Sequence, residues 1–282
     1  MLQIRQMSLR RVESRNNAQL KLARKIRDGR VRDRIFVEGV RLVEEAFRSD
    51  VQIEFAVIKA GLGGEERERR LIDSLFHRDV DVLELPMGLF ETIADTSTSQ
   101  GVIIIGKRPP SDRETFELEI SIGHCAIPIV IMLTEVNNPS NLGAAVRTAE
   151  AAGAEGLIVT ERSADIFSPK SLRAAMGSAF RLPIWAPAPF DAATQWARSN
   201  GRPITAATGE GKTSYLDLDW KLPRLVAFGS EAHGVNDEIL ASATETVKIP
   251  IEPAVESLNL AVSVGVMLFE ARRQCLAAHD RR

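Results

Sequence analysis

The carboxy-terminal part of the chain alternates short apolar segments with helical ones, and this alternation constrains the fold more than any other feature. The apolar segments have the length of strands and lie at 129–133, 156–160, 203–208, 224–229 and 247–251. Helical patterns begin near residues 141, 168 and 236, and a longer one covers 258–277. Such alternation predicts a parallel sheet covered on both faces, with ligands at the carboxyl ends of its strands. We therefore expect an α/β domain over residues 127–282.

The amino-terminal part predicts a second, smaller α/β domain over residues 1–107. Residues 17–47 have the spacing of a helix, a loop and another helix, and residues 65–76 are helical again. Short apolar strands are expected at 55–58, 80–85 and 101–106. Two prolines then follow in a polar stretch, and proline cannot donate to a strand ladder. Residues 108–126 are therefore expected to be a linker.

Composition excludes several classes of protein. Of the 282 residues, 44% are apolar and 26% are charged, which is ordinary for a globular protein. The two cysteines exclude a disulfide framework and suit a reducing compartment, and the four histidines are too scattered to indicate a metal site. No apolar run has the length of a membrane span. We expect a soluble cytoplasmic protein with no metal and no membrane partner.

Charge is distributed unevenly. Residues 1–48 contain 13 basic and 6 acidic side chains, although the whole chain has a formal net charge of -2. A basic end on a mildly acidic body favours contact with a polyanion such as nucleic acid. On charge alone, a solvated helix face is an equally good interpretation.

Residues 206–213 match a relaxed phosphate-binding loop, which would indicate a nucleotide hydrolase. A working loop of this kind opens directly into a helix, whose amino terminus helps to hold the phosphates. Here only a short segment follows before Pro223. A glycine-rich surface loop is the better interpretation.

Three other segments each follow an expected strand and consist of polar, glycine-containing or proline-containing turns. They read Asn141-x-Gly143-x-x-x-Arg147, then Gly229-x-Glu231-x-x-Gly234, then Ile249-Pro250 with Ser257-Leu258-Asn259 eight residues further on. In this order and at these separations they resemble the motifs of the SpoU (TrmH) family of RNA ribose 2'-O-methyltransferases, within the SPOUT superfamily. A weaker resemblance over residues 14–107 is to the substrate-binding domain of such enzymes, which is similar to an RNA-binding ribosomal protein.

The resemblance implies a carboxy-terminal trefoil knot, S-adenosylmethionine as cofactor and an RNA substrate, with ribosomal RNA favoured over transfer RNA. It implies cofactor contacts at Gly229, Ile249 and Leu258. The positions that match the family's catalytic motifs are Arg147, Asn141, Glu231, Ser257 and Asn259. Because a guanidinium stays protonated in proteins, we expect Arg147 to polarise the ribose hydroxyl and bind the adjacent phosphate.

The resemblance also implies a homodimer whose active site is completed across a twofold interface. The last helix is small at Ala261, Ser263 and Gly265, which would permit close contact. The resemblance makes the basic amino-terminal stretch an expected RNA contact, through Arg24, Arg27, Arg30, Arg32 and Arg34. Two alternatives remain open: a catalytically silent RNA-binding assembly factor and the nucleotide hydrolase.

Overall fold

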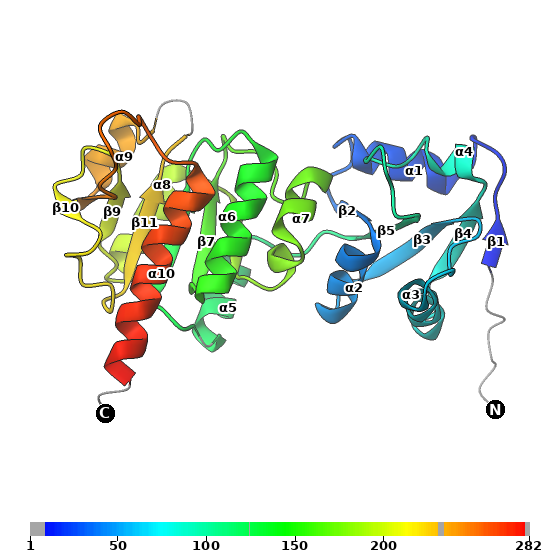
Figure 1. Ribbon diagram of the computed structural model, residues 1–282, viewed down its shortest axis with the longest axis horizontal. Helices are drawn as coiled ribbons and strands as arrows, with labels where there is room; N and C mark the ends of the chain where they lie inside the picture. The colour runs from blue at the N-terminus through cyan, green and yellow to red at the C-terminus, as the bar shows by residue number, and fades with distance from the viewer. Residues whose placement is uncertain (1–8, 124, 231–233, 280–282) are drawn as a thin grey trace. The chain divides into compact units, whose positions relative to one another are not determined.

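The chain folds into two compact units (Figure 1). The structure is a computed structural model and describes residues 9–123, 125–230 and 234–279. The first unit comprises Met1–Pro109 together with Phe167–Phe180, and the second comprises Pro110–Ile166 together with Arg181–Arg282.

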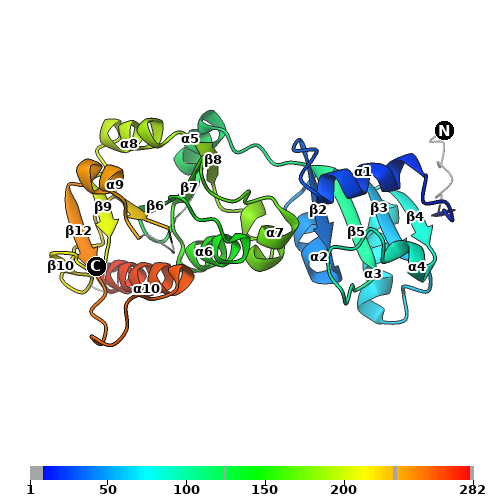
Figure 2. The same ribbon diagram turned by 90° about the horizontal axis from the view of Figure 1, so that it is seen from above.

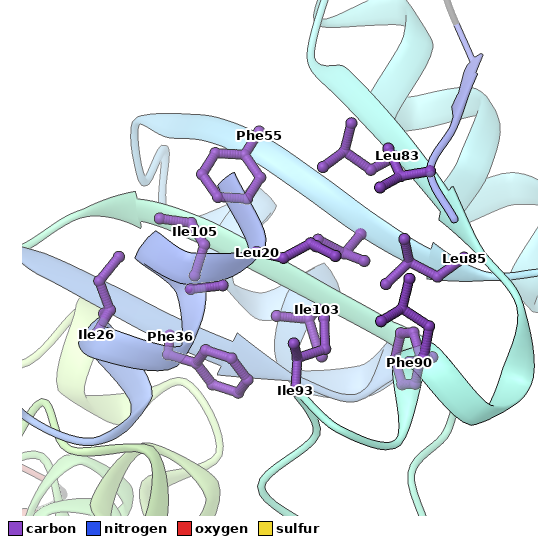
Figure 3. Close-up of a cluster of buried hydrophobic side chains, with 14 residues drawn as sticks. Leu20, Ile26, Phe36, Phe55, Leu83, Leu85, Phe90, Ile93, Ile103 and Ile105 are labelled. Atoms are coloured by element: carbon purple, nitrogen blue, oxygen red, sulfur yellow. The ribbon is translucent and has the colours of Figure 1, made fainter. Parts of the chain in front are cut away.

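The first unit is built on a mixed five-stranded sheet in the order β1-β4-β3-β5-β2. Its strands are β1 (Leu9–Arg11), β2 (Arg34–Glu38), β3 (Ile53–Lys59), β4 (Asp81–Leu85) and β5 (Val102–Lys107). Its helices are α1 (Ala18–Arg27), α2 (Val40–Arg48), α3 (Glu66–His77), α4 (Met87–Phe90) and α7 (Pro169–Ala175). Alternate strand residues face opposite sides, so Phe55 and Ile105 pack with Leu20 of α1 in one apolar layer (Figure 3).

Strand β2 lies where the sequence predicts a loop between two helices, so that expectation is wrong. Ile35, Phe36 and Val37 are each at most 1% exposed, and β2 pairs antiparallel with β5. Val37 has helical spacing with Val40 and Val43, but Val37 belongs to strand β2 whereas the two other valines belong to helix α2. The apolar pattern therefore runs across a strand-to-helix junction. That junction is Gly39, whose φ of 101° favours glycine.

The second unit contains a parallel seven-stranded sheet in the order β10-β12-β9-β11-β6-β7-β8, which confirms the predicted class of fold. Its strands are β6 (Ile129–Leu133), β7 (Gly156–Thr160), β8 (Ile184–Ala188), β9 (Ile204–Ala207), β10 (Thr213–Ser214), β11 (Arg224–Phe228) and β12 (Glu245–Lys248). Its helices are α5 (Arg113–Ile122), α6 (Pro139–Ala152), α8 (Phe190–Ser199), α9 (Asp237–Ser242) and α10 (Leu260–His279). Helices α6 and α10 lie side by side on one face, and α5 and α8 cover the other (Figure 2).

The segment expected as a linker, residues 108–126, differs from that expectation because it contains helix α5. Asp112 caps the helix by accepting a hydrogen bond from the Thr115 amide at 2.9 Å, and the buried Phe116 packs edge-on against Trp196 of α8. The ring also lies where a Cβ at Gly156 would meet it, at 2.7 Å. Helix α5 is therefore part of the second unit's core.

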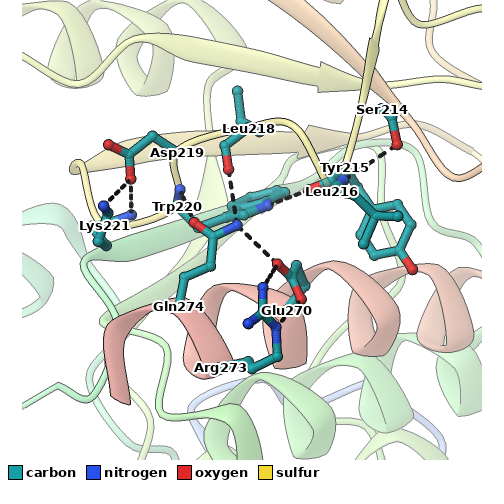
Figure 4. A network of polar contacts seen from close by, with 10 residues as sticks. All are labelled: Ser214, Tyr215, Leu216, Leu218, Asp219, Trp220, Lys221, Glu270, Arg273 and Gln274. Carbon is teal, nitrogen blue, oxygen red and sulfur yellow. Dashed lines mark hydrogen bonds and ion pairs between the residues drawn. The ribbon is translucent and has the colours of Figure 1, made fainter. Parts of the chain in front are cut away.

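Helix α10 is held in place by polar contacts with the loop between β10 and β11 (Figure 4). The Gln274 side chain accepts a hydrogen bond from the Trp220 amide at 3.0 Å and donates to the Leu218 carbonyl at 3.1 Å. Gln274 also donates to Glu270, which forms an ion pair with Arg273. The hydrogen bond from Arg273, more than that from Gln274, lowers the pKa of the Glu270 carboxyl. Within the described residues, no helix is long and apolar enough to cross a membrane.

Candidate functional site

A cavity of about 540 Å³ opens at the carboxyl ends of β9, β11 and β12 in the second unit. Its wall contains all three predicted cofactor positions, Gly229, Ile249 and Leu258. Phe228, Ile251 and Met267 add apolar surface, and the backbone of the turns adds polar groups. A concave site at strand ends, lined by both apolar side chains and polar groups, suits a small amphiphilic cofactor.

Three of the predicted catalytic residues also line this cavity: Asn141, Ser257 and Asn259. The Asn259 side-chain amide (Nδ2) donates a hydrogen bond to the Asn141 side-chain oxygen (Oδ1) at 3.2 Å, although the two residues are 118 positions apart. The first and third motifs therefore meet at one place. Asn141 is the third residue of α6, and Asn259 directly precedes α10.

Local contacts hold the first two motifs against each other. The Thr134 hydroxyl donates to the Phe228 carbonyl at 2.9 Å, which ties the end of β6 to the end of β11. Asn138 then caps α6 by accepting from the Ser140 amide at 3.0 Å, and Pro139 occupies the first helical position. Helix capping thus explains the polar turn after β6, and Asn141 in the first turn of α6 lines the cavity.

Gly229 is required by a close approach of the backbone. A Cβ at this position would lie 1.8 Å from the Gly234 carbonyl oxygen, a distance that no side chain tolerates. The Gly234 amide donates to the Ser230 carbonyl at 2.8 Å, which folds this turn back on Gly229. Both glycines of the second motif line the cavity. Glu231, the predicted carboxylate partner of a guanidinium, lies outside the described residues.

Arg147 does not join Asn141, Ser257 and Asn259 at the cavity. It is exposed on α6 and does not line the cavity, whereas Asn141 on the same helix does. Six helical residues correspond to a rise of about 9 Å and a rotation of about 120° from one side chain to the other. Asn141 and Arg147 therefore lie on different sides of α6.

The loop that resembles a phosphate-binding loop forms part of the cavity wall through Thr208 and Gly209. It is not followed by a helix: Lys212 leads into β10, whose Thr213 pairs with Val247 of β12. This geometry contradicts the nucleotide-hydrolase interpretation. Sequence reasoning tested the loop only against that motif and so missed its place in the cavity.

Sequence reasoning also missed Glu256, which lines the cavity between Ile251 and Ser257. It is the only ionisable side chain among the described residues of the cavity wall. No cluster of metal-ligating side chains occurs in the described part of the chain.

In the first unit, the arginines predicted to contact RNA differ in their surroundings. Arg27 donates to the Thr92 and Ala94 carbonyls at 3.2 and 3.1 Å, and Arg24 donates to the Arg15 carbonyl at 3.3 Å. Arg34 is paired with Glu54 and Asp33, and the hydrogen bond and charge of Glu54 raise its pKa. The side chains of Arg30 and Arg32 are exposed and form no hydrogen bond or ion pair with other described residues, although the Arg30 amide donates to the Lys25 carbonyl at 2.8 Å.

The loop after α4 is fixed from both sides. The buried Glu38 carboxylate accepts hydrogen bonds from the amides of Asp95 and Thr96, at 2.8 and 3.2 Å, and from the Thr96 hydroxyl at 2.6 Å. Gln100 accepts from the Val40 amide at 2.9 Å. Asp95 forms an ion pair with Arg173 of the same unit, at 2.6 Å. The residues that resemble the substrate-binding domain thus hold one loop in a defined position.

Comparison with known proteins bears on both units. Residues 128–269 match the model of the SpoU rRNA Methylase family, and residues 17–104 match the MRM3-like substrate binding domain. A 23S rRNA (adenosine(1067)-2'-O)-methyltransferase of Streptomyces laurentii is 32% identical over 86% of this chain and 87% of its own length. The crystal structure of an AdoMet-bound rRNA methyltransferase from Sinorhizobium meliloti is 30% identical, covers 94% of this chain and 98% of that one, and superposes with a TM-score of 0.79.

Two other relatives are matched over less of their length. The alignment spans 54% of a cyanobacterial tRNA/rRNA methyltransferase and 66% of the zebrafish mitochondrial rRNA methyltransferase 3A. The fold, the cavity and these similarities together define the class of protein: one that shares its fold with the solved RNA 2'-O ribose methyltransferase and rRNA methyltransferase structures. The chain belongs to the SpoU rRNA Methylase family.

Proposed function

We propose that this chain methylates a ribose 2'-hydroxyl of structured ribosomal RNA in the cytoplasm. The observation that carries the proposal is the single cavity where Gly229, Ile249 and Leu258 lie beside the bonded pair Asn141 and Asn259. The names of the Streptomyces and zebrafish relatives favour ribosomal RNA over transfer RNA. A silent RNA-binding factor is not favoured, because the cavity and the Asn141–Asn259 contact are both present.

S-adenosylmethionine supplies an electrophilic methyl group on a positively charged sulfur. The chain's task is to bring the 2'-oxygen into line and to assist loss of its proton. Asn141, Ser257 and Asn259 offer hydrogen-bond donors and acceptors at the cavity, where they would orient the ribose. Arg147 keeps its own proton, so we assign it to binding the neighbouring phosphate and polarising the hydroxyl. The hydroxyl proton then passes to that phosphate or to water.

Arg147 would perform this role in the cavity of a second copy of the chain. It lies away from its own cavity on α6, which packs beside α10. Helix α10 exposes three apolar side chains at seven-residue spacing: Val262, Phe269 and Leu276 are 51, 50 and 53% exposed. A stripe of this spacing suits contact with another helix. Two of the small residues expected from the sequence to permit contact between copies have neighbours within the chain instead. Gly265 faces Thr148 of α6, and Ser263 lines the cavity.

Mixed dimers test whether Arg147 acts on the partner. One copy would carry Arg147→Ala and the other Gly229→Val, which fills the space at the cavity turn. If the guanidinium acts across the interface, the mixture regains activity because one intact cavity faces one intact arginine. Mixtures that stay as inactive as either parent would refute action across the interface.

Phe269→Glu should shift the sedimentation equilibrium from dimer to monomer. The trefoil knot stays a prediction.

Methyl transfer itself is tested with labelled cofactor, ribosomal RNA and transfer RNA as separate substrates. We expect the label to enter ribosomal RNA and to stay on the sugar when the nucleobases are removed. Arg147→Ala should lower the rate of methyl transfer at least a hundredfold. Comparing ribose-methylation maps of total RNA with and without the protein identifies the nucleotide. Absence of any ribose label with both RNAs would overturn the proposal.

The salt dependence of RNA binding tests the front surface. Each lost phosphate contact reduces the slope of log affinity against log salt by about 0.7 to 0.9. We expect that reduction for Arg30→Gln and Arg32→Gln. Arg34→Gln is the matched control, because Glu54 and Asp33 already neutralise its charge. Equal slopes for all three variants would mean that Arg30 and Arg32 belong to a solvated surface that does not contact RNA.

A further inference from the structure

The cavity has an uneven distribution of charge. Among its described wall residues, Glu256 is ionisable and every other side chain is neutral. Glu256 follows β12 in the segment that leads to α10, and it is the residue before Ser257. The site described above therefore presents a carboxylate to its ligand without a described cation to offset it.

The ligand and its product differ chiefly in charge. S-adenosylmethionine carries a sulfonium, an ammonium and a carboxylate, so its net charge is +1. When the methyl group leaves, the sulfur takes back the bonding electron pair and S-adenosylhomocysteine has a net charge of zero. The adenosine and amino-acid parts are the same in both molecules. A wall made only of apolar groups and neutral hydrogen-bonding groups would hold the two nearly equally.

We propose that Glu256 is a specificity-determining residue that favours the sulfonium cofactor over its neutral-sulfur product. Two opposite unit charges about 4 Å apart attract by about 1 kcal/mol in a water-like dielectric, which raises a binding constant about fivefold. The attraction is stronger beside a low-dielectric wall. The attraction is lost at the moment of methyl transfer. Glu256 therefore assists exchange of spent cofactor for fresh cofactor. The inference rests on the cofactor assigned to this cavity, and not on the identity of the RNA.

An alternative position for the carboxylate makes a different prediction. If Glu256 met the ammonium group, which cofactor and product share, its removal would weaken both ligands by the same factor. The ratio of the two dissociation constants therefore reports on the sulfonium, whereas a general loss of cavity shape would leave the ratio unchanged.

The test is calorimetry on the full chain with Glu256→Gln, a change that keeps the side chain's size and removes its charge. We expect the dissociation constant for S-adenosylmethionine to rise at least about fivefold and that for S-adenosylhomocysteine to change less than about twofold. An analogue with a protonated amine in place of the methylsulfonium should behave like the cofactor. Glu252→Gln is the matched control, because Glu252 lies on the same segment outside the cavity wall.

The outcomes separate two kinds of failure. If the wild-type chain binds both ligands and Glu256→Gln changes them equally or not at all, the inference is wrong and the proposed function stands. If the wild-type chain binds neither ligand, both fail. A supporting second readout is ionic strength: rising salt should narrow the wild-type preference for the charged ligand and leave the Glu256→Gln preference unchanged.

Discussion

Replacing Gly229 with alanine should strongly weaken cofactor binding by moving one wall of the cavity. The new Cβ would lie 1.8 Å from the Gly234 carbonyl oxygen, whereas real Cβ atoms keep at least about 3.0 Å from such an atom. The turn must therefore shift by roughly 1.2 Å, the difference between these distances. A misplacement of about 1 Å in a positioned site can cost roughly a hundredfold in reaction rate, and we take the same factor for the loss of cofactor affinity. We expect the dissociation constant for S-adenosylmethionine to rise by at least that factor, or about 2.7 kcal/mol.

Calorimetry measures this change, and Gly209→Ala is the control. Gly209 lines the same cavity, but an added Cβ there meets no protein atom within 4 Å. The control should bind within about tenfold of wild type, as expected for a methyl group in open space. Thermal unfolding of both variants shows whether the fold is retained. A folded Gly229→Ala variant that binds the cofactor within tenfold of wild type would refute the close-approach argument.

Glu38→Ala should lower the free energy of unfolding by about 3 to 5 kcal/mol in urea titrations, because two amides and one hydroxyl lose a buried charged acceptor. The exposed Glu91→Ala is its control, and a change below about 1 kcal/mol for Glu38→Ala would contradict this account. Lys212→Ala should leave cofactor affinity unchanged in calorimetry, because Lys212 precedes strand β10 and only its amide is bonded, to Thr246. Loss of binding in that variant would restore a ligand role for this lysine. Because the pKa of Glu270 is lowered in the folded chain, its ionised form stabilises the fold at neutral pH and this contribution is lost as pH falls through the lowered value. Melting temperatures measured below pH 4.5 should therefore fall less steeply for Glu270→Gln than for wild type, and parallel curves would exclude this residue as a cause.

Buried parallel strands were the easiest elements to predict. Strands β6 and β7 have the bounds expected from the sequence, because strands covered on both faces are continuous apolar runs. Strand β8 was missed because Pro187 interrupts its apolar run. Proline is accepted there since β8 lies at the edge of the sheet.

The cavity was predictable only in part. Gly229 and Asn141 were predicted from the resemblance to the SpoU motifs, because glycine and small polar residues at strand ends are by themselves only what turns and capped helices need. Glu256 carried no such signal, since an acidic residue before a helix is common on any surface. The separation of Arg147 from its own cavity follows from helix geometry once the bounds of α6 are known. The motif alone does not indicate it, because the motif does not say that both residues lie on one helix.

The assignment of Phe167–Phe180 to the first unit means that the polypeptide crosses between units at three points, after residues 109, 166 and 180. A substrate-binding module here is thus discontinuous in sequence. Exchanging residues 1–109 for the corresponding part of another methyltransferase would remove the packing of α7 against β2 and the ion pair of Arg173 with Asp95. A chimaera intended to redirect RNA choice must therefore transplant both pieces together. The same linkage makes insertions between 166 and 181 a change to the recognition module, even though they fall inside the catalytic sequence.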